Sequence, residues 1–309
     1  MKSDSNSRPL TAHLSLLGAE VMWGLMAPVG KDAMSHGIDS LDMVSLRVLG
    51  AAVLFWLGSL FAPKEHVPLR HILAFAGAAL LAVVFNQCLF TIGLSITSPV
   101  NASIVTTSMP IFAMIWALII LHEPITLKKA GGVMMGCAGA VILILTSAGA
   151  ASSKVGDIRG DLMCLGAQFS FALYLALFNP IVRRYSVFTV NKWMFLWATV
   201  FIWPFTGSHF FSTPFSAVTA QTWMETAYVV IFGTFVSYLL MMVGQRTLRP
   251  TVVSVYNYVQ PIVAVTVSVA TGMSLFTLPQ SVAILLVFGG VGLVTKSKSK
   301  QDMARKDGQ

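Results

Sequence analysis

The sequence predicts an all-α integral membrane protein whose ten transmembrane helices form two inverted five-helix repeats, with both termini in the cytoplasm. Three observations predict this fold. The 309-residue chain is 56% hydrophobic and only 10% charged, whereas soluble domains contain about 25% charged residues. Its basic residues fall mainly on one side of the predicted spans, and its second half is a weak copy of its first half.

A helix needs about 20 apolar residues to cross the hydrocarbon core of a bilayer. The stretches that approach or exceed this length are 14–34, 41–61, 72–93, 99–121, 128–147, 161–180, 193–207, 223–243, 251–271 and 279–295. The first contains Glu20 and has no convincing cleavage site after it, so we interpret it as a permanent span rather than a signal peptide. The seventh is the shortest, because we expect it to end near Pro204.

The connections between these stretches are too short to fold as a soluble domain. We therefore expect a first repeat over 14–147, a second repeat over 160–296, and cytoplasmic tails over 1–13 and 297–309.

The distribution of basic residues predicts the orientation. With a cytoplasmic N-terminus, 16 of the 20 Lys and Arg residues lie in inside segments, 3 lie in outside segments, and Arg47 alone lies within a span. This is the excess of cytoplasmic positive charge that orients membrane proteins. The net charge of +8 is dispersed rather than gathered on one folded face, so we expect no nucleic-acid partner.

An internal repeat relates the two halves. The segment "GLSITSPVNASIVTTSMPI" from Gly93 matches "GQRTLRPTVVSVYNYVQPI" from Gly244, and both Ser103 with Ser254 and Pro110 with Pro261 are separated by 151 residues. Five spans per copy is an odd number, so the second copy must enter the membrane upside down. Inverted repeats of this kind build secondary transporters, whose substrate sites lie near the midplane beside kinked helices.

Several segments resemble the EamA-type branch of the drug/metabolite transporter superfamily. In the first half they are "MWGLMAPVGKDAM", "NASIVTTSMPIFAMIWALIILHEPIT" and "KKAGGVMMGCAGAVILI". In the second half they are "GDLMCLGAQFSFALYLALF", "VVSVYNYVQPIVAVTVSVATG" and "QSVAILLVFGGVGLV". The resemblance covers about residues 14–296 and implies alternating access around a cavity lined by the first, third, fourth, sixth, eighth and ninth helices. The family often repeats the glutamate found here as Glu123, but Ser274 stands at the second position.

Polar residues on the expected cavity helices are the candidate substrate contacts. Helical spacing places Thr106, Thr107 and Pro110 on one face of the fourth helix, and other polar residues lie near the midplane of their helices. The predicted cavity residues are Trp23, Asn86, Gln87, Ser103, Thr106, Thr107, Gln168, Tyr174, Tyr238, Ser254, Asn257 and Tyr258. The alternative is that these side chains bond backbone carbonyls or join helices.

Three further residues carry separate hypotheses. Pro110 and Pro261 are interpreted as paired hinges. Glu20 is the carboxylate deepest within a span, where a charge costs at least about 2.5–3.5 kcal/mol, so it is a candidate for proton coupling or else a structural acid bonded within the bundle. Arg47 is expected on the opposite side of the membrane midplane from Glu20, which argues against a direct ion pair and favours a structural role.

Several function classes are disfavoured. The six histidines lie at span ends or in loops and the three cysteines have no metal-ligand spacing, so we expect no metal, no cofactor and no enzyme. The favoured function is a gradient-driven exporter in the bacterial inner (plasma) membrane. Its partners would be the lipid bilayer and a small neutral, zwitterionic or amphipathic substrate, with the amino-acid-like class implied by the resemblance. The alternative is a non-transporting scaffold or receptor that retains the fold.

Overall fold

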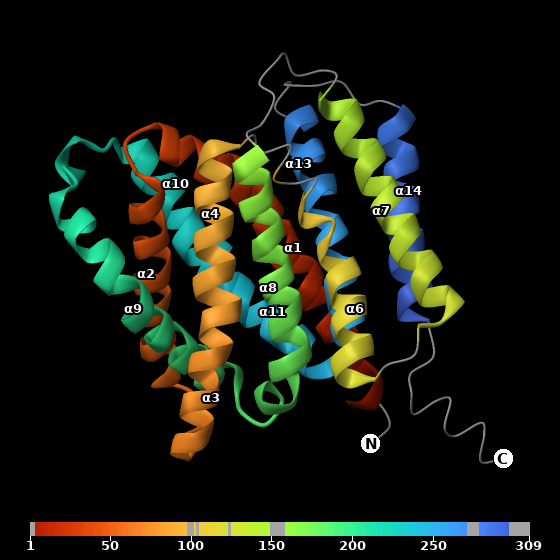
Figure 1. Cartoon of the computed structure of the whole chain (residues 1–309), viewed down its shortest axis with the longest axis horizontal. Helices are drawn as coiled ribbons and strands as arrows, with labels where there is room; N and C mark the ends of the chain where they lie inside the picture. The colour runs from red at the N-terminus through yellow and green to blue at the C-terminus, as the bar shows by residue number, and fades with distance from the viewer. Residues whose placement is uncertain are drawn as a thin grey trace.

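The computed structural model describes residues 4–97, 102, 105–122, 125–148, 158–270 and 278–296. These residues form helices packed side by side, with successive long helices running in opposite directions (Figure 1). The helices are α1 (Asp4–Ser35), α2 (Ser40–Ser59), α3 (Leu69–Ala79), η1 (Leu80–Phe85), α4 (Asn86–Ile96), α6 (Met109–Leu121), α7 (Leu127–Ala148), α8 (Ile158–Val182), α9 (Val187–Ser212), η2 (Phe215–Ala217), α10 (Ala220–Val230), η3 (Ile231–Val236), α11 (Ser237–Thr247), α12 (Pro250–Val255), η4 (Tyr256–Tyr258), α13 (Val259–Ala270) and α14 (Leu278–Thr295).

The predicted all-α membrane class is confirmed. Five helical segments in the described part of the chain are long and apolar enough to cross a bilayer, and α6 is a shorter apolar helix. The five segments are Leu10–Ser35, Ser40–Ser59, Leu69–Ile96, Leu162–Val182 and Ala220–Thr247. The protein is therefore a multi-pass integral membrane protein.

Two of these segments share an unusual internal construction. In each, an α-helix passes into six residues of π-helix and back into α-helix: α3, η1 and α4 in one, and α10, η3 and α11 in the other. The starts of the three parts are 69, 80 and 86 in the first segment and 220, 231 and 237 in the second, a constant difference of 151. A π-helical turn inserts a residue and rotates the rest of the helix about its axis, and such turns concentrate at functional sites.

Pro110 and Pro261 stand near the start of helices rather than deep within them. Pro110 is the second residue of α6, after a turn at Thr107 and Ser108, and Pro261 is the third residue of α13, after the 3-10 turn η4. A proline has no N–H to donate to the carbonyl one turn earlier, and the tighter turn before each proline is where the regular α-helical bonding changes. The backbone irregularity therefore lies just before each proline.

The prediction that the seventh span ends at Pro204 is wrong. Helix α9 runs from Val187 to Ser212 with Pro204 inside it. One proline removes one hydrogen bond, and the helices of membrane proteins tolerate this where neighbouring groups compensate.

Glycines permit the closest helix contacts. A Cβ atom on Gly132 of α7 would lie 2.8 Å from the carbonyl oxygen of Gly290 of α14, and one on Gly290 would lie 2.6 Å from that of Gly132. These helices lie side by side although far apart in sequence (Figure 1). The same reciprocal approach joins Gly93 of α4 to Gly160 of α8, at 2.8 and 2.7 Å. Small residues are what membrane helices need at such contacts.

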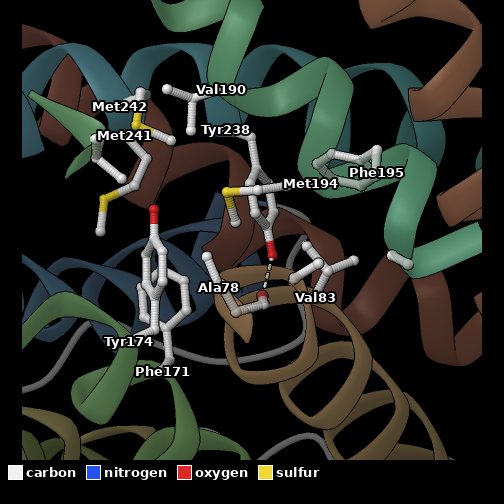
Figure 2. Packing of buried hydrophobic residues seen from close by; sticks show 14 of the residues in the cluster. Ala78, Val83, Phe171, Tyr174, Val190, Met194, Phe195, Tyr238, Met241 and Met242 are labelled. Atoms are coloured by element: carbon white, nitrogen blue, oxygen red, sulfur yellow. Dashed lines mark hydrogen bonds between the residues drawn. The ribbon is translucent and has the colours of Figure 1, made fainter. Parts of the chain in front are cut away.

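The main apolar core contains aromatic and methionine side chains among many small aliphatic ones. Figure 2 shows Tyr238 of α11 beside Met194 and Phe195 of α9, with its hydroxyl directed towards the segment that carries Ala78 and Val83. The Tyr238 hydroxyl donates to the carbonyl oxygen of Ala82 at 2.8 Å, within η1. Its ring makes an edge contact with Phe195, with centroids 5.1 Å apart.

Cationic side chains bind helix ends at both ends of the bundle. The Lys31 ammonium at the end of α1 donates to the carbonyl oxygens of Leu94, Ser95 and Thr97, at 2.9, 2.8 and 3.1 Å. Arg183, just after α8, donates from Nη2 to the carbonyl oxygen of Leu248 at 2.8 Å. Such contacts satisfy carbonyls that a helix C-terminus leaves free.

A loop carboxylate binds the opposite kind of helix end. Glu65, between α2 and α3, accepts the Ser186 N–H ahead of α9 with both carboxylate oxygens, at 3.0 and 2.9 Å. Partial burial alone would raise the pKa of Glu65, but these hydrogen bonds and the nearby Arg246 outweigh it and hold the pKa below its ordinary value.

Candidate functional site

A pocket lies where helices from both halves of the chain meet. Its empty volume is about 480 Å³, counting the part open to the surroundings. Seven of the predicted cavity residues line it: Trp23, Asn86, Gln87, Thr106, Gln168, Tyr238 and Asn257. They come from α1, α4, α8, α11, η4 and the short described stretch ahead of α6. Both repeats therefore contribute polar and aromatic side chains to one wall.

Five more residues complete the pocket wall. They are Met26, Arg47, Phe90, Phe171 and Gln260. A structural role was expected for Arg47, and the other four were not among the predicted cavity residues. Gln260 carried a usable signal, because it is a polar residue in a span directly before Pro261. Met26, Phe90 and Phe171 carried no such signal, because an apolar residue that lines a pocket looks the same in the sequence as one in a packed core.

Glu20 lies directly behind the polar wall of this pocket. Its side chain is fully buried, and Gln260 donates from Nε2 to one carboxylate oxygen at 2.7 Å. The Asn257 amide completes the contact when its nitrogen faces Glu20, which places that nitrogen 2.9 and 3.2 Å from the two oxygens. We adopt this orientation because it pairs a donor with the carboxylate instead of facing oxygen to oxygen.

Gly24 explains why Glu20 can reach the other half of the chain. It lies four residues after Glu20 on the same face of α1. A Cβ atom there would lie 2.9 Å from the carbonyl oxygen of Gln260 and 2.9 Å from the Cβ of Val263. The absence of a side chain at Gly24 therefore lets the start of α13 approach α1 closely enough for the Gln260 hydrogen bond.

The Arg47 side chain extends from α2 and lines the pocket. Its side chain is only 4% exposed. Nη1 donates to Thr91 Oγ1 of α4 at 2.9 Å, and Nε donates to Thr234 Oγ1 of η3 at 3.1 Å. Within the described residues Arg47 has no carboxylate partner, in agreement with the expectation that it does not pair with Glu20. Arg47 therefore both joins α2 to two other helices and lines the pocket.

Aromatic rings form the apolar side of the pocket. Trp23 meets Phe171 edge-on, with ring centroids 6.2 Å apart, and meets Tyr238 edge-on at 5.9 Å. The Trp23 indole N–H donates to the carbonyl oxygen of Gly233 in η3 at 3.0 Å, which fixes the ring. Perpendicular arrangements of this kind are favourable for aromatic rings.

One hydrogen bond joins the equivalent positions of the two halves. Gln87 donates from Nε2 to the Tyr238 hydroxyl at 3.1 Å, and the two residues are 151 apart in sequence. Both line the pocket, and both are almost fully buried. Two positions that are 151 residues apart in sequence therefore meet at the pocket.

Four predicted cavity residues lie in contacts outside the pocket wall. The Tyr174 hydroxyl donates to Gln245 Oε1 at 3.1 Å, and the Tyr258 hydroxyl donates to the carbonyl oxygen of Val133 at 3.1 Å. The Ser254 hydroxyl donates to the carbonyl oxygen of Thr251, and Thr107 is buried and offers its carbonyl oxygen to Cys137. For Tyr174, Tyr258 and Ser254 the alternative interpretation, bonding within or between helices, describes the observed contacts.

Three residues named from the sequence lie outside the described residues. They are Ser103, Glu123 and Ser274. In the described residues no cluster of three or more His, Cys, Asp or Glu side chains could hold a metal ion.

A multi-pass helical protein with a partly polar pocket built from both halves of the chain has an architecture that membrane transport proteins use. The particular family follows from a direct match. The model of the EamA-like transporter family matches residues 10–145 and again residues 158–296. The chain belongs to this family, as its segments suggested.

Similar proteins are also named as transporters. The chain is 24% identical over 301 residues to the uncharacterized transporter YetK of Bacillus subtilis, covering 95% of this chain and 89% of that protein. It is 23% identical over 304 residues to the uncharacterized transporter YyaM of the same organism, covering 96% and 99%. A crystal structure matches with a TM-score of 0.73 at 16% identity and covers 98% of this chain and 99% of that one. This likeness shows the fold.

Proposed function

We propose that the protein is a secondary transporter that exports small zwitterionic or amphipathic metabolites of the amino-acid-like class by alternating access, with Glu20 coupling export to protons. The pocket at the Gln87–Tyr238 contact carries the proposal, because equivalent positions of the two halves meet there. A scaffold has no need of a pocket shared in this way.

The proposed architecture is ten transmembrane helices arranged as two inverted repeats. The two family matches, over 10–145 and 158–296, support it. So does the constant difference of 151 between the two π-containing segments. Figure 1 adds that α3 to α4 and α10 to α11 run in opposite directions, and that α14 ends at the same end of the bundle where α1 begins. An inverted repeat predicts both features.

The proposed orientation places both termini in the cytoplasm of a bacterial cell, with the protein in the inner membrane. The test uses single cysteines at positions 153 and 299, which lie outside the described residues. The first should react with an impermeant reagent from outside and the second only from inside. Reaction of both from one side would contradict the inverted topology.

Transport itself is tested by flux into proteoliposomes. We expect the purified protein to accelerate entry of at least one amino acid or amphipathic metabolite from a panel, and a pH gradient to drive its accumulation. Empty liposomes are the control for leak. A complete lack of flux across the panel would favour the scaffold alternative.

Glu20 is the proposed proton carrier because it is fully buried and contacts amides instead of a cation. A carboxylate at such depth is costly when charged and is readily neutralised by a proton. Glu20→Gln keeps the shape and removes the charge. We expect it to lose accumulation driven by a pH gradient and to keep exchange of labelled for unlabelled substrate. Gradient-driven uptake that survives would leave Glu20 as a structural acid.

A further inference from the structure

Two of the three guanidinium nitrogens of Arg47 donate hydrogen bonds to neighbouring helices. Nε and Nη1 donate to the hydroxyls of Thr234 and Thr91, which come from two different helices. These two contacts fix the plane of the group. Nη2 donates to no acceptor among the described residues. The Arg47 side chain is only 4% exposed, and it lines the pocket.

A cation within a membrane-spanning helix is costly unless its charge is compensated. A structural arginine in a membrane helix is expected to bind carboxylates or backbone carbonyls through all of its nitrogens. The neutral hydroxyls of Thr91 and Thr234 instead orient the group without neutralising it. The positive charge is therefore available to an anion in the pocket.

The charge balance of the pocket limits that anion. Among the described residues Arg47 is the charged side chain that lines the wall, while Glu20 lies behind Asn257 and Gln260. A carboxylate carries one negative charge and matches one guanidinium. A phosphate monoester carries about two charges near neutral pH and would leave one uncompensated within the membrane.

The rest of the wall suits an apolar body. Trp23, Phe90 and Phe171 present rings to the pocket, and Met26 adds a flexible thioether. Aromatic and methionine side chains form adaptable apolar binding surfaces.

We propose that Arg47 is the substrate-recognition residue of this pocket, and that its Nη2 binds the carboxylate of a molecule whose apolar body lies against Trp23 and Phe171. Thr91 and Thr234 are positioning residues that aim the guanidinium. This inference rests on the proposed transport function and names the chemical group that the transporter must find on its substrate.

The test measures equilibrium binding, so it does not depend on transport. The full chain in lipid nanodiscs is dialysed against three probes: 3-phenylpropionate, its neutral amide 3-phenylpropanamide, and 2-phenylethyl phosphate. We expect the carboxylate to bind at least about tenfold more tightly than the amide, as a charge-assisted hydrogen bond allows. In Arg47→Gln protein this ratio should fall to about one, while amide affinity stays within about threefold.

Two further variants keep the test decisive. Thr234→Val retains the Arg47 charge and removes the hydroxyl that accepts from Nε. It should lower the ratio of carboxylate to amide affinity at least about threefold. This variant replaces Arg47→Gln in the test if Arg47→Gln protein does not fold. Arg70→Gln removes an exposed arginine at the start of α3 and should leave the ratio unchanged. The proposal is overturned if wild-type protein shows no preference for the carboxylate, if it prefers the phosphate, or if the ratio survives both pocket variants.

The two proposals can fail separately. Binding of 3-phenylpropionate that depends on Arg47, together with no flux of any solute, would contradict transport and support the recognition role. Flux of a solute at the same rate in wild-type and Arg47→Gln protein would support transport and contradict the recognition role.

Discussion

Replacing Tyr238 by phenylalanine tests the contact between the two halves at the pocket. The change removes one hydroxyl that donates to the carbonyl oxygen of Ala82 at 2.8 Å and accepts from Gln87 at 3.1 Å. Interhelical hydrogen bonds in membranes contribute about 0.6 kcal/mol on average and up to about 1.7. Two such bonds at or somewhat above the average value give an expected loss of about 1–2 kcal/mol.

The cost should lie in this range because the partners have little to replace the hydroxyl. Ala82 is fully buried, and Oε1 of Gln87 already lacks a partner within the described structure. The ring of the substituted residue keeps its edge contacts with Trp23 and Phe195. The loss is therefore one of hydrogen bonding rather than of packing.

The assay is thermal unfolding of the detergent-solubilised protein, followed by the fraction that remains monodisperse after heating. A loss of 1–2 kcal/mol corresponds to a fall in melting temperature of roughly 2–6 °C. Tyr228→Phe is the matched control, because it removes one longer hydrogen bond, to the Met22 carbonyl oxygen at 3.2 Å, away from the pocket. Equal melting temperatures for the two variants and the wild type would refute the reasoning.

Three other changes give expected outcomes. Gly290→Val should weaken the contact with α7 more than Gly290→Ala does, because even a Cβ would lie 2.6 Å from the Gly132 carbonyl oxygen. Cleavage of the folded variants by chymotrypsin checks this, and equal resistance of the two variants and the wild type would contradict it. Glu65→Gln should destabilise the protein near neutral pH and lose this effect in acid, because a carboxyl with a lowered pKa stabilises the folded state only while it is ionised; the difference in melting temperature from wild type should be complete above the ordinary carboxyl pKa of 4.5 and shrink as pH falls below it. Pro261→Ala should slow turnover in the flux assay and leave half-saturation within a few-fold, and wild-type turnover would mean that the irregularity before the proline does not depend on it.

The membrane class was predictable because hydropathy is summed over about 20 residues and tolerates errors at single positions. The paired prolines were predictable as landmarks, since the repeat fixes their spacing. Their setting was not: apolar composition runs through Ser108 and Tyr258 without marking the turns that precede Pro110 and Pro261.

The pocket was harder to predict from the sequence than the fold. Tyr258 and Asn257 are neighbours in one span, yet only Asn257 lines the pocket, while Tyr258 occupies the space left by Gly136, where a Cβ would lie 2.2 Å from its ring. Such complementarity depends on which helices become neighbours. The surroundings of Arg47 could not be predicted for a related reason, because its depth along one helix says nothing of Thr91 and Thr234 on two others.

The two cationic helix-end contacts tie points 151 residues apart in sequence to other parts of the bundle. Thr97 and Leu248 are these points, and they offer carbonyl oxygens to Lys31 and Arg183. Separating α1 from α4 would break the hydrogen bonds from the Lys31 ammonium to three carbonyl oxygens, and moving Arg183 away from Leu248 would break at least one more. Neither cation lines the pocket. Substitutions at Lys31 and Arg183 would therefore change the cost of separating these helices while leaving the pocket wall as it is.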